Sequence, residues 1–454
     1  MHDATTHNKH SPSPTDDNIH TDSPRRTSDP ATTSRRQHRY PRDRQFFSFR
    51  ILLGLALVAL AFALLLVRQT WALQARHYLP FPRSRLFTAC TATMASQEYV
   101  RELQVAQLAV QRAAILTKRV FHEKAKGTVS KDDKSPVTIG DFGAQALIIS
   151  ALRYQFPTDE IVAEEEADQL RADANLRDTI WSFVQNTRLD DPAAEDVLGG
   201  PIPSVDTMLD VLDQGKSKGG SVGRIWTIDP IDGTKGFLRG GQYAVCVGLI
   251  VDGDVKVGVL GCPNLPTDDA TKLTVDVGAN QSDEGSNVGV LFSAVKGDGA
   301  YSRPLTTGNV LAGRAIHMNA LSTKEDLLQA SFCESVEAGH SNQDESAQIT
   351  RILGITKPSV RMDSQAKYGS IARGAGDIYL RLPVSATYQE KIWDHAAGDL
   401  IVREAGGQVT DTLGRRLNFG HGRTLAENKG VVAAPAAIHD RVLSVVQTVL
   451  KISP

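Results

Sequence analysis

Residues 243–263, YAVCVGLIVDGDVKVGVLGCP, contain two alternating apolar runs that flank Asp252-Gly253-Asp254. Two such runs around a turn-forming triplet predict a β-hairpin. Apolar residues recur at helical spacing from about residue 97 to 117, and again in DFGAQALIISALRYQF at 141–156. Strands and helices that alternate in this way along a chain predict α/β or α+β layers around the hairpin.

The first part of the sequence differs in character from the rest. Residues 1–50 are rich in Ser, Thr, Pro and Arg, which predicts a disordered tail. Residues 51–67, ILLGLALVALAFALLLV, carry no charge and predict a single transmembrane helix, with a buried core helix or a signal-peptide core as alternatives. Residues 68–93 are interpreted as a linker. The excess of Arg before the apolar run favours a single-pass membrane protein with a cytosolic N-terminus.

Met94 opens a stretch that resembles the start of a complete soluble domain, so a cytoplasmic product beginning there is the alternative. With 454 residues, 41% of them hydrophobic, the chain is long enough to bury more than one core. A net charge of −2 does not indicate a nucleic-acid partner. Four cysteines without a C-x-x-C spacing argue against a disulfide scaffold or a zinc site.

Two aspartates stand three residues apart in WTIDPIDGTKGF, residues 226–237. A plain surface turn is one interpretation, because Asp-Pro-x-Asp-Gly is good turn chemistry. However, Asp229 and Asp232 follow a hydrophobic strand, and α/β proteins build their sites at such strand ends. Two carboxylates this close repel each other unless a cation lies between them. Gly233-Thr234 then offers backbone amides and a hydroxyl to a phosphate.

Further acidic residues occupy comparable places. Glu164 directly follows the apolar residues Ile161-Val162-Ala163, whereas Asp394 lies at the start of a predicted helix, which it could simply cap. Ligands that are all oxygen atoms, without His or Cys at metal-binding spacing, favour Mg²⁺ over zinc. The sequence therefore predicts a magnesium site built from separate acidic segments.

Several long blocks, in order, resemble the inositol-monophosphatase superfamily of Mg²⁺-dependent phosphatases, and within it the 3′(2′),5′-bisphosphate nucleotidase branch. The blocks are SPVTIGDFGAQALI, the Glu-Glu pair after a strand, DPIDGTKGFLRGGQYAV, DSQAKYGSIARGAGDIYLRLP and YQEKIWDHAAGD. The resemblance extends from about Met94 to the C-terminus and implies a layered αβαβα sandwich. Its expected parts are an N-terminal subdomain at 94–305, with most metal ligands, and a C-terminal subdomain at 306–454.

The resemblance also implies roles for individual residues. Two or three Mg²⁺ ions are expected on Glu164, Asp229, Asp232, Asp394 and the carbonyl of Ile231. Asp141 and Thr234 are expected to orient and deprotonate the attacking water. The implied substrate-binding residues are Thr234, Asp394, His340, Ser364, Lys367 and Arg381.

The implied reaction removes the 3′-phosphate of adenosine 3′,5′-bisphosphate and leaves AMP. The resemblance adds 3′-phosphoadenylyl sulfate as a second substrate, a place in sulfate assimilation, and inhibition by lithium. Two alternatives remain open at this point: an inositol phosphate 1-phosphatase, and a membrane-anchored binding protein without activity. Every implied metal-binding and catalytic residue type is present in this sequence, which argues against the binding protein.

Overall fold

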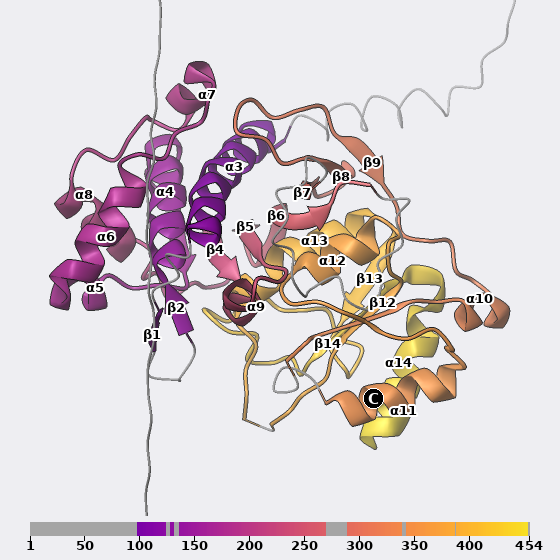
Figure 1. Ribbon diagram of the computed structural model, residues 1–454. Coiled ribbons are helices and arrows are strands. Elements are labelled where there is room, and N and C mark those ends of the chain that lie inside the picture. The colour runs from indigo at the N-terminus through magenta and orange to yellow at the C-terminus, as the bar shows by residue number, and fades with distance from the viewer. Residues whose placement is uncertain are drawn as a thin grey trace, which may run out of the picture. The chain divides into compact units, whose positions relative to one another are not determined.

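The computed structural model describes residues 98–123, 128–130, 136–268, 288–337, 342–385 and 387–452 (Figure 1). Within these residues the chain forms two sheets, of seven and five strands, together with a short two-stranded pair, β1 (Thr128–Ser130) and β2 (Pro136–Thr138). The predicted tail at 1–50, the linker at 68–93 and the alternative start at Met94 lie outside the described residues.

The first sheet has the strand order β3-β4-β5-β6-β7-β8-β9. Its strands are β3 (Glu160–Ala163), β4 (Arg224–Asp232), β5 (Ala244–Val251), β6 (Asp254–Pro266), β7 (Val288–Val295), β8 (Gly299–Pro304) and β9 (Arg314–Ile316). Only β3 and β4 pair in parallel, and the other neighbours are antiparallel. The predicted hairpin is present, because β5 and β6 join through Asp252 and Gly253 at φ of 50° and 77°, as two-residue hairpin turns require.

Both faces of this sheet are covered, which explains why its strands are so apolar. Neighbouring side chains along a strand point to opposite faces. On β5, Cys246 and Ile250 therefore join the core that includes α12 (Ala366–Ala372) and α13 (Ala396–Glu404). Val245 and Val247 instead join the core formed with α3 (Val100–His122) and α4 (Ile139–Gln155).

The second sheet has the order β11-β10-β12-β14-β13, and β14 is antiparallel to both of its neighbours. Its strands are β10 (Phe332–Glu334), β11 (Val360–Arg361), β12 (Ile378–Arg381), β13 (Gly407–Thr410) and β14 (Val431–Pro435). Helices α12 and α13 contact strands of both sheets, and α11 (Gln343–Leu353) and α14 (Ala436–Leu450) pack on the second sheet (Figure 1). The result is the expected αβαβα order of layers.

Shorter helices complete the described chain: α5 (Asp168–Ala172), α6 (Ala174–Val184), α7 (Pro192–Val197), α8 (Val205–Asp213), α9 (Thr234–Arg239), α10 (Lys324–Leu328) and the 3₁₀ helix η3 (Ile392–Asp394). Strand β9 still belongs to the first sheet although it lies beyond residue 305. The division into subdomains at 94–305 and 306–454 stays a prediction.

The prediction of a transmembrane helix, and with it that of a single-pass membrane protein with a cytosolic N-terminus, needs correction. Residues 51–67 lie outside the described residues. Within the part of the chain that the structure describes, no helix combines the length and the apolar character needed to cross a bilayer. Helix α3 is long enough at 23 residues, but it carries Arg101, Arg112 and Lys118, whereas a spanning helix needs about 20 predominantly apolar residues.

A close contact between α13 and β6 gives a first test of this packing. A Cβ atom added at Gly258 would lie 2.7 Å from the carbonyl oxygen of Ala397, so Gly258→Ala must push the helix away from the sheet. We expect the substitution to lower the free energy of unfolding by about 1–3 kcal/mol in urea denaturation. Gly308→Ala is the control, because the added atom would meet its nearest neighbour at an ordinary 3.9 Å. Equal stability of the two variants would contradict the packing.

Candidate active site

The parallel pairing of β3 with β4 brings the first two acidic segments together. Ala163 lies opposite Ile228, so the next residues, Glu164 and Asp229, emerge at the same edge of the sheet. A bulge in β4 between Asp229 and Asp232 then lets both aspartates stay within the strand. Asp229 is buried, with 3% of its surface exposed. The Asp-Pro-Ile-Asp segment is therefore the end of a buried strand, and the interpretation as a plain surface turn does not fit.

The remaining acid comes from the middle layer, just before α13. Asp394 is the last residue of η3 and stands one residue before His395, the N-cap of α13. It faces the same cavity, of about 380 Å³, as Glu164, Asp229 and Asp232. The backbone amide of Gln365 donates to Asp232 Oδ2 at 2.5 Å. Four carboxylates from three separate segments of the sequence thus share one cavity.

The carboxylates strongly affect one another's protonation. Burial, reinforced by the charges of Glu164 and Asp232, raises the pKa of Asp229 well above its ordinary value. Burial, with the nearby charge of Asp394, also raises the pKa of Asp232 to about 7. Burial raises the pKa of Asp394 to about 6, although the Arg381 cation opposes that shift. So much negative charge in one buried place is stable at neutral pH only with protons or cations bound.

The donor set suits a hard divalent cation. Asp229 Oδ1 is buried and has no hydrogen-bond partner among the described residues. Such an atom is costly to bury unless something fills its coordination. Carboxylate and carbonyl oxygens are the ligands that Mg²⁺ prefers, so the residues present fit magnesium.

These pKa values predict how stability responds to pH and metal. In metal-free folded protein the pKa values of Asp232 and Asp394 are about 7 and about 6, above the ordinary 3.8. Their stabilising contribution is fully present at low pH and is lost as the pH rises through these values. We expect the melting temperature in EDTA to fall between about pH 5 and 7, and Mg²⁺ to restore it. Asp232→Asn should flatten the pH dependence, and a melting temperature in EDTA that rises over this range would contradict the assignment.

Thr234 and Asp141 each lie in the first turn of a helix. Gly233, at φ 87°, ends the strand segment, and Thr234 begins α9 and donates its hydroxyl to the carbonyl of Ile231 at 3.2 Å. Asp141 lies in the first turn of α4, where its Oδ2 accepts from the amide of Thr138 at 2.8 Å. Its charge contributes to the raised pKa of Asp229, although Asp141 itself does not line the cavity.

Three of the predicted nucleotide-binding residues, Ser364, Lys367 and Arg381, line the same cavity. Ser364 has a left-handed backbone, with φ of 70°. Lys367 is buried, and its Nζ donates to the carbonyls of Met362 at 3.1 Å and Ser364 at 2.8 Å. Lys367 is therefore not an ordinary surface charge, and burial lowers its pKa. His340 lies outside the described residues.

At this end of the cavity, Arg381 is held by Glu390, a residue that the sequence did not single out. Arg381 Nε lies 2.8 Å from Glu390 Oε2, and Arg381 Nη2 lies 3.6 Å from Asp394 Oδ2. Burial alone would raise the pKa of Glu390, but Arg381 overcomes this effect and lowers it to about 2. His395 contacts the hydroxyl of Tyr368 at 2.8 Å and Glu390 at 3.3 Å.

Ligand atoms of Glu390, Asp394 and His395 lie within 4.8 Å of one another, which is compatible with a metal ion. The cluster can also be explained without a metal ion. The Arg381 guanidinium supplies the positive charge, and both ring nitrogens of His395 have partners. Glu390 was visible in the block YQEKIWDHAAGD, but no local pattern indicates that Arg381, at the end of β12, reaches it.

The chain is similar to known proteins over most of its length. The model of the inositol monophosphatase family matches residues 97–451. A 3′(2′),5′-bisphosphate nucleotidase of Emericella nidulans is 65% identical over 354 residues, which cover 78% of this chain and 99% of the relative. One of Schizosaccharomyces pombe is 48% identical over 358 residues, covering 78% and 97%.

Among solved structures, the inositol monophosphatase of Thermotoga maritima aligns with 77% of this chain and 98% of its own, at 21% identity and a TM-score of 0.49. The family match and the identity to the two fungal relatives together confirm the resemblance noted in the sequence motifs. The chain belongs to the inositol monophosphatase family.

Proposed function

We propose that this protein is a Mg²⁺-dependent 3′(2′),5′-bisphosphate nucleotidase that hydrolyses adenosine 3′,5′-bisphosphate to AMP and phosphate. The observation that carries the proposal is one cavity in which an acidic group, Glu164, Asp229, Asp232 and Asp394, faces the cations Lys367 and Arg381. The acidic end suits a phosphate bound through metal ions, and the cations suit a second phosphate. The relatives that carry this activity in their names support the choice of substrate.

Glu164, Asp229, Asp232, Asp394 and the carbonyl of Ile231 would hold two or three Mg²⁺ ions. When bound, Mg²⁺ stabilises charge on the phosphoryl oxygens and makes a water easier to deprotonate. The donor set supports this assignment because every member offers oxygen and Asp229 Oδ1 has no hydrogen-bond partner among the described residues.

Thr234 and Asp141 would handle the proton of the attacking water. A threonine hydroxyl is too weak a base by itself, so it needs a carboxylate behind it. In this proposal Thr234 Oγ1 orients the water and Asp141 receives its proton. The water oxygen bonds to phosphorus as the bond from phosphorus to the ribose 3′ oxygen breaks, and that oxygen takes up a proton from solvent.

The cationic end would distinguish a bisphosphate from a simple sugar phosphate. Arg381 is held in a fixed orientation by Glu390, and Lys367 by two backbone carbonyls, so neither cation must be ordered when a phosphate binds. Ser364, together with His340 outside the described residues, completes the proposed nucleotide contacts. The family resemblance extends the proposal to 3′-phosphoadenylyl sulfate, to a place in sulfate assimilation and to inhibition by lithium.

A substrate panel tests the proposal. Phosphate release by the full-length protein with Mg²⁺ is measured for adenosine 3′,5′-bisphosphate, inositol 1-phosphate and inositol 1,4-bisphosphate. We expect kcat/KM to be at least about tenfold higher for the nucleotide, which equals about 1.4 kcal/mol of transition-state discrimination. A preference for either inositol compound would identify an inositol phosphate phosphatase. No release from any substrate would identify a binding protein.

A further inference from the structure

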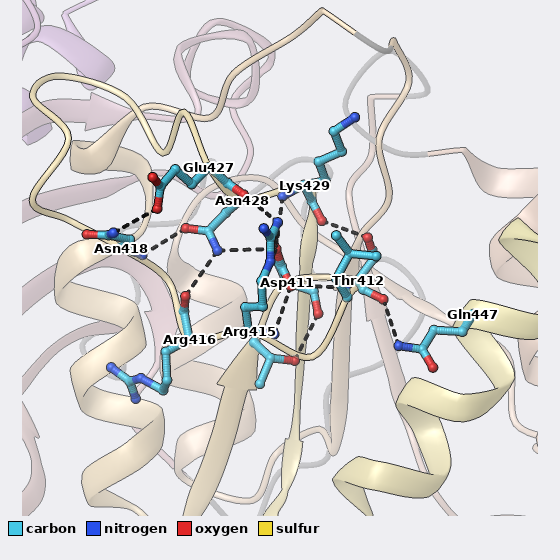
Figure 2. A network of polar contacts seen from close by, with 11 residues as sticks. Asp411, Thr412, Arg415, Arg416, Asn418, Glu427, Asn428, Lys429 and Gln447 are labelled. Atoms are coloured by element: carbon cyan, nitrogen blue, oxygen red, sulfur yellow. Dashed lines mark hydrogen bonds and ion pairs between the residues drawn. The ribbon is translucent and has the colours of Figure 1, made fainter. Parts of the chain in front are cut away.

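The segment between β13 and β14, residues 411–430, is closed at its base by a buried carboxylate, and we name it the Asp411 loop. Asp411 Oδ1 accepts from the amides of Leu413 at 3.0 Å and Arg415 at 2.9 Å, and its Oδ2 accepts from Arg415 Nη2 at 2.6 Å (Figure 2). Asn428, at the other end of the loop, donates to the same Oδ2 at 3.2 Å. Because these hydrogen bonds join the two ends of the Asp411 loop, the rest of the loop has a fixed orientation.

Arg423, in the Asp411 loop, contacts the end of strand β3. Arg423 Nη2 donates to the carbonyl of Ala163 at 2.6 Å, and Nη1 donates to the carbonyls of Ser217 at 3.0 Å and Gly215 at 3.3 Å. Ala163 is the last residue of β3 and directly precedes Glu164. The guanidinium therefore fixes the backbone from which the Glu164 carboxylate projects.

The same residue also contacts the segment that carries Asp394. The Arg423 guanidinium carbon lies 4.9 Å from the centre of the Trp393 ring, and the Arg423 carbonyl accepts from the amide of Ile392 at 3.2 Å. Beside it, the amide of Leu425 donates to the carbonyl of Glu390 at 2.8 Å. Arg423 thus contacts Ala163, which precedes Glu164 in the first sheet, and Trp393, which precedes Asp394 in the middle layer.

We propose that Arg423 is a positioning residue that holds the Glu164 and Asp394 segments at the separation at which both carboxylates serve one cation site. The inference rests on the proposed function, in which both are metal ligands. Carboxylates around an empty site repel each other, so the scaffold must resist their separation. A planar guanidinium suits this role, because it can donate in several directions while its face packs on an aromatic ring.

Calorimetric titration of Mg²⁺ into the full-length protein, without substrate, tests the proposal. Arg423→Gln is expected to weaken Mg²⁺ binding about tenfold, the lower end of the effect typical when a group that orients a metal ligand is lost. In phosphate-release assays the half-saturating Mg²⁺ concentration should rise by the same factor, while kcat at saturating Mg²⁺ stays within about twofold of wild type. Arg423→Lys keeps the charge but lacks the planar fork, so an intermediate affinity is expected.

Arg153→Gln is the matched control. Arg153 Nη1 donates to the carbonyls of Pro157 at 3.2 Å and Asp159 at 2.5 Å, beside the opposite end of β3. Its loss should leave Mg²⁺ affinity unchanged. Wild-type affinity in both Arg423 variants, or an equal loss in Arg153→Gln, would overturn the positioning role. If the wild-type protein itself bound no Mg²⁺, the proposed function would fail instead, so the two failures are distinguishable.

Discussion

The Asp229→Asn variant is expected to remain folded while its kcat falls at least about 10³-fold, or about 4 kcal/mol of transition-state stabilisation. Asp229 is buried among other carboxylates that raise its pKa, and its Oδ1 has no hydrogen-bond partner among the described residues. Its charge therefore does not stabilise the metal-free fold. An amide keeps the shape of the side chain but removes the negative charge that a divalent cation requires.

Asp159→Asn is the matched control for this prediction. Asp159 is also buried, but it lies at the other end of the same strand pair, where it accepts from Arg224 Nε at 3.0 Å and Trp226 Nε1 at 2.9 Å. Its replacement should lower the melting temperature and leave kcat of the folded protein unchanged. Steady-state phosphate release and thermal denaturation measure both effects. Near-wild-type turnover in Asp229→Asn would refute the metal-site assignment.

Thr234→Val is expected to lower kcat about 10³-fold, within the range of 10² to 10⁴ that a positioned proton-transfer group contributes. Valine matches the shape of threonine but has no hydroxyl to orient the attacking water. In the structure that hydroxyl lies at the start of α9 and donates to the Ile231 carbonyl at 3.2 Å, next to the proposed metal ligands. Single-turnover phosphate release at saturating Mg²⁺ measures the effect.

The Thr234→Ser variant tests the role of the hydroxyl independently of the methyl group. We expect it to keep kcat within about tenfold of wild type, because the oxygen remains. Calorimetric Mg²⁺ binding by Thr234→Val should match wild type, since the side chain is not a proposed ligand. A valine variant with normal kcat, or one whose kcat recovers with excess Mg²⁺, would contradict a role in proton transfer.

Local spacing in the sequence was sufficient to predict the strands that carry the site. The hairpin around Asp252-Gly253 depends on alternation and on residues that tolerate positive φ, and both are visible over a few positions. The acidic residues after β3 and at the end of β4 were found in the same way. The transmembrane prediction for residues 51–67 depended on apolar content alone, and no helix among the residues that the structure describes could cross a membrane.

Other features depended on which segments pack together. The parallel register of β3 and β4 places Glu164 beside Asp229, and η3 brings Asp394 to them from the middle layer. Arg423 escaped notice because its partner, the Ala163 carbonyl, lies 260 residues away along the chain. Glu390 escaped notice because no local pattern links it to Arg381. Patterns over three or four residues report which face of an element is apolar, so they reveal strands, helices and their acidic ends. Only long-range packing decides which of those ends share a cavity, because contacts between distant segments leave no periodic trace in a single sequence.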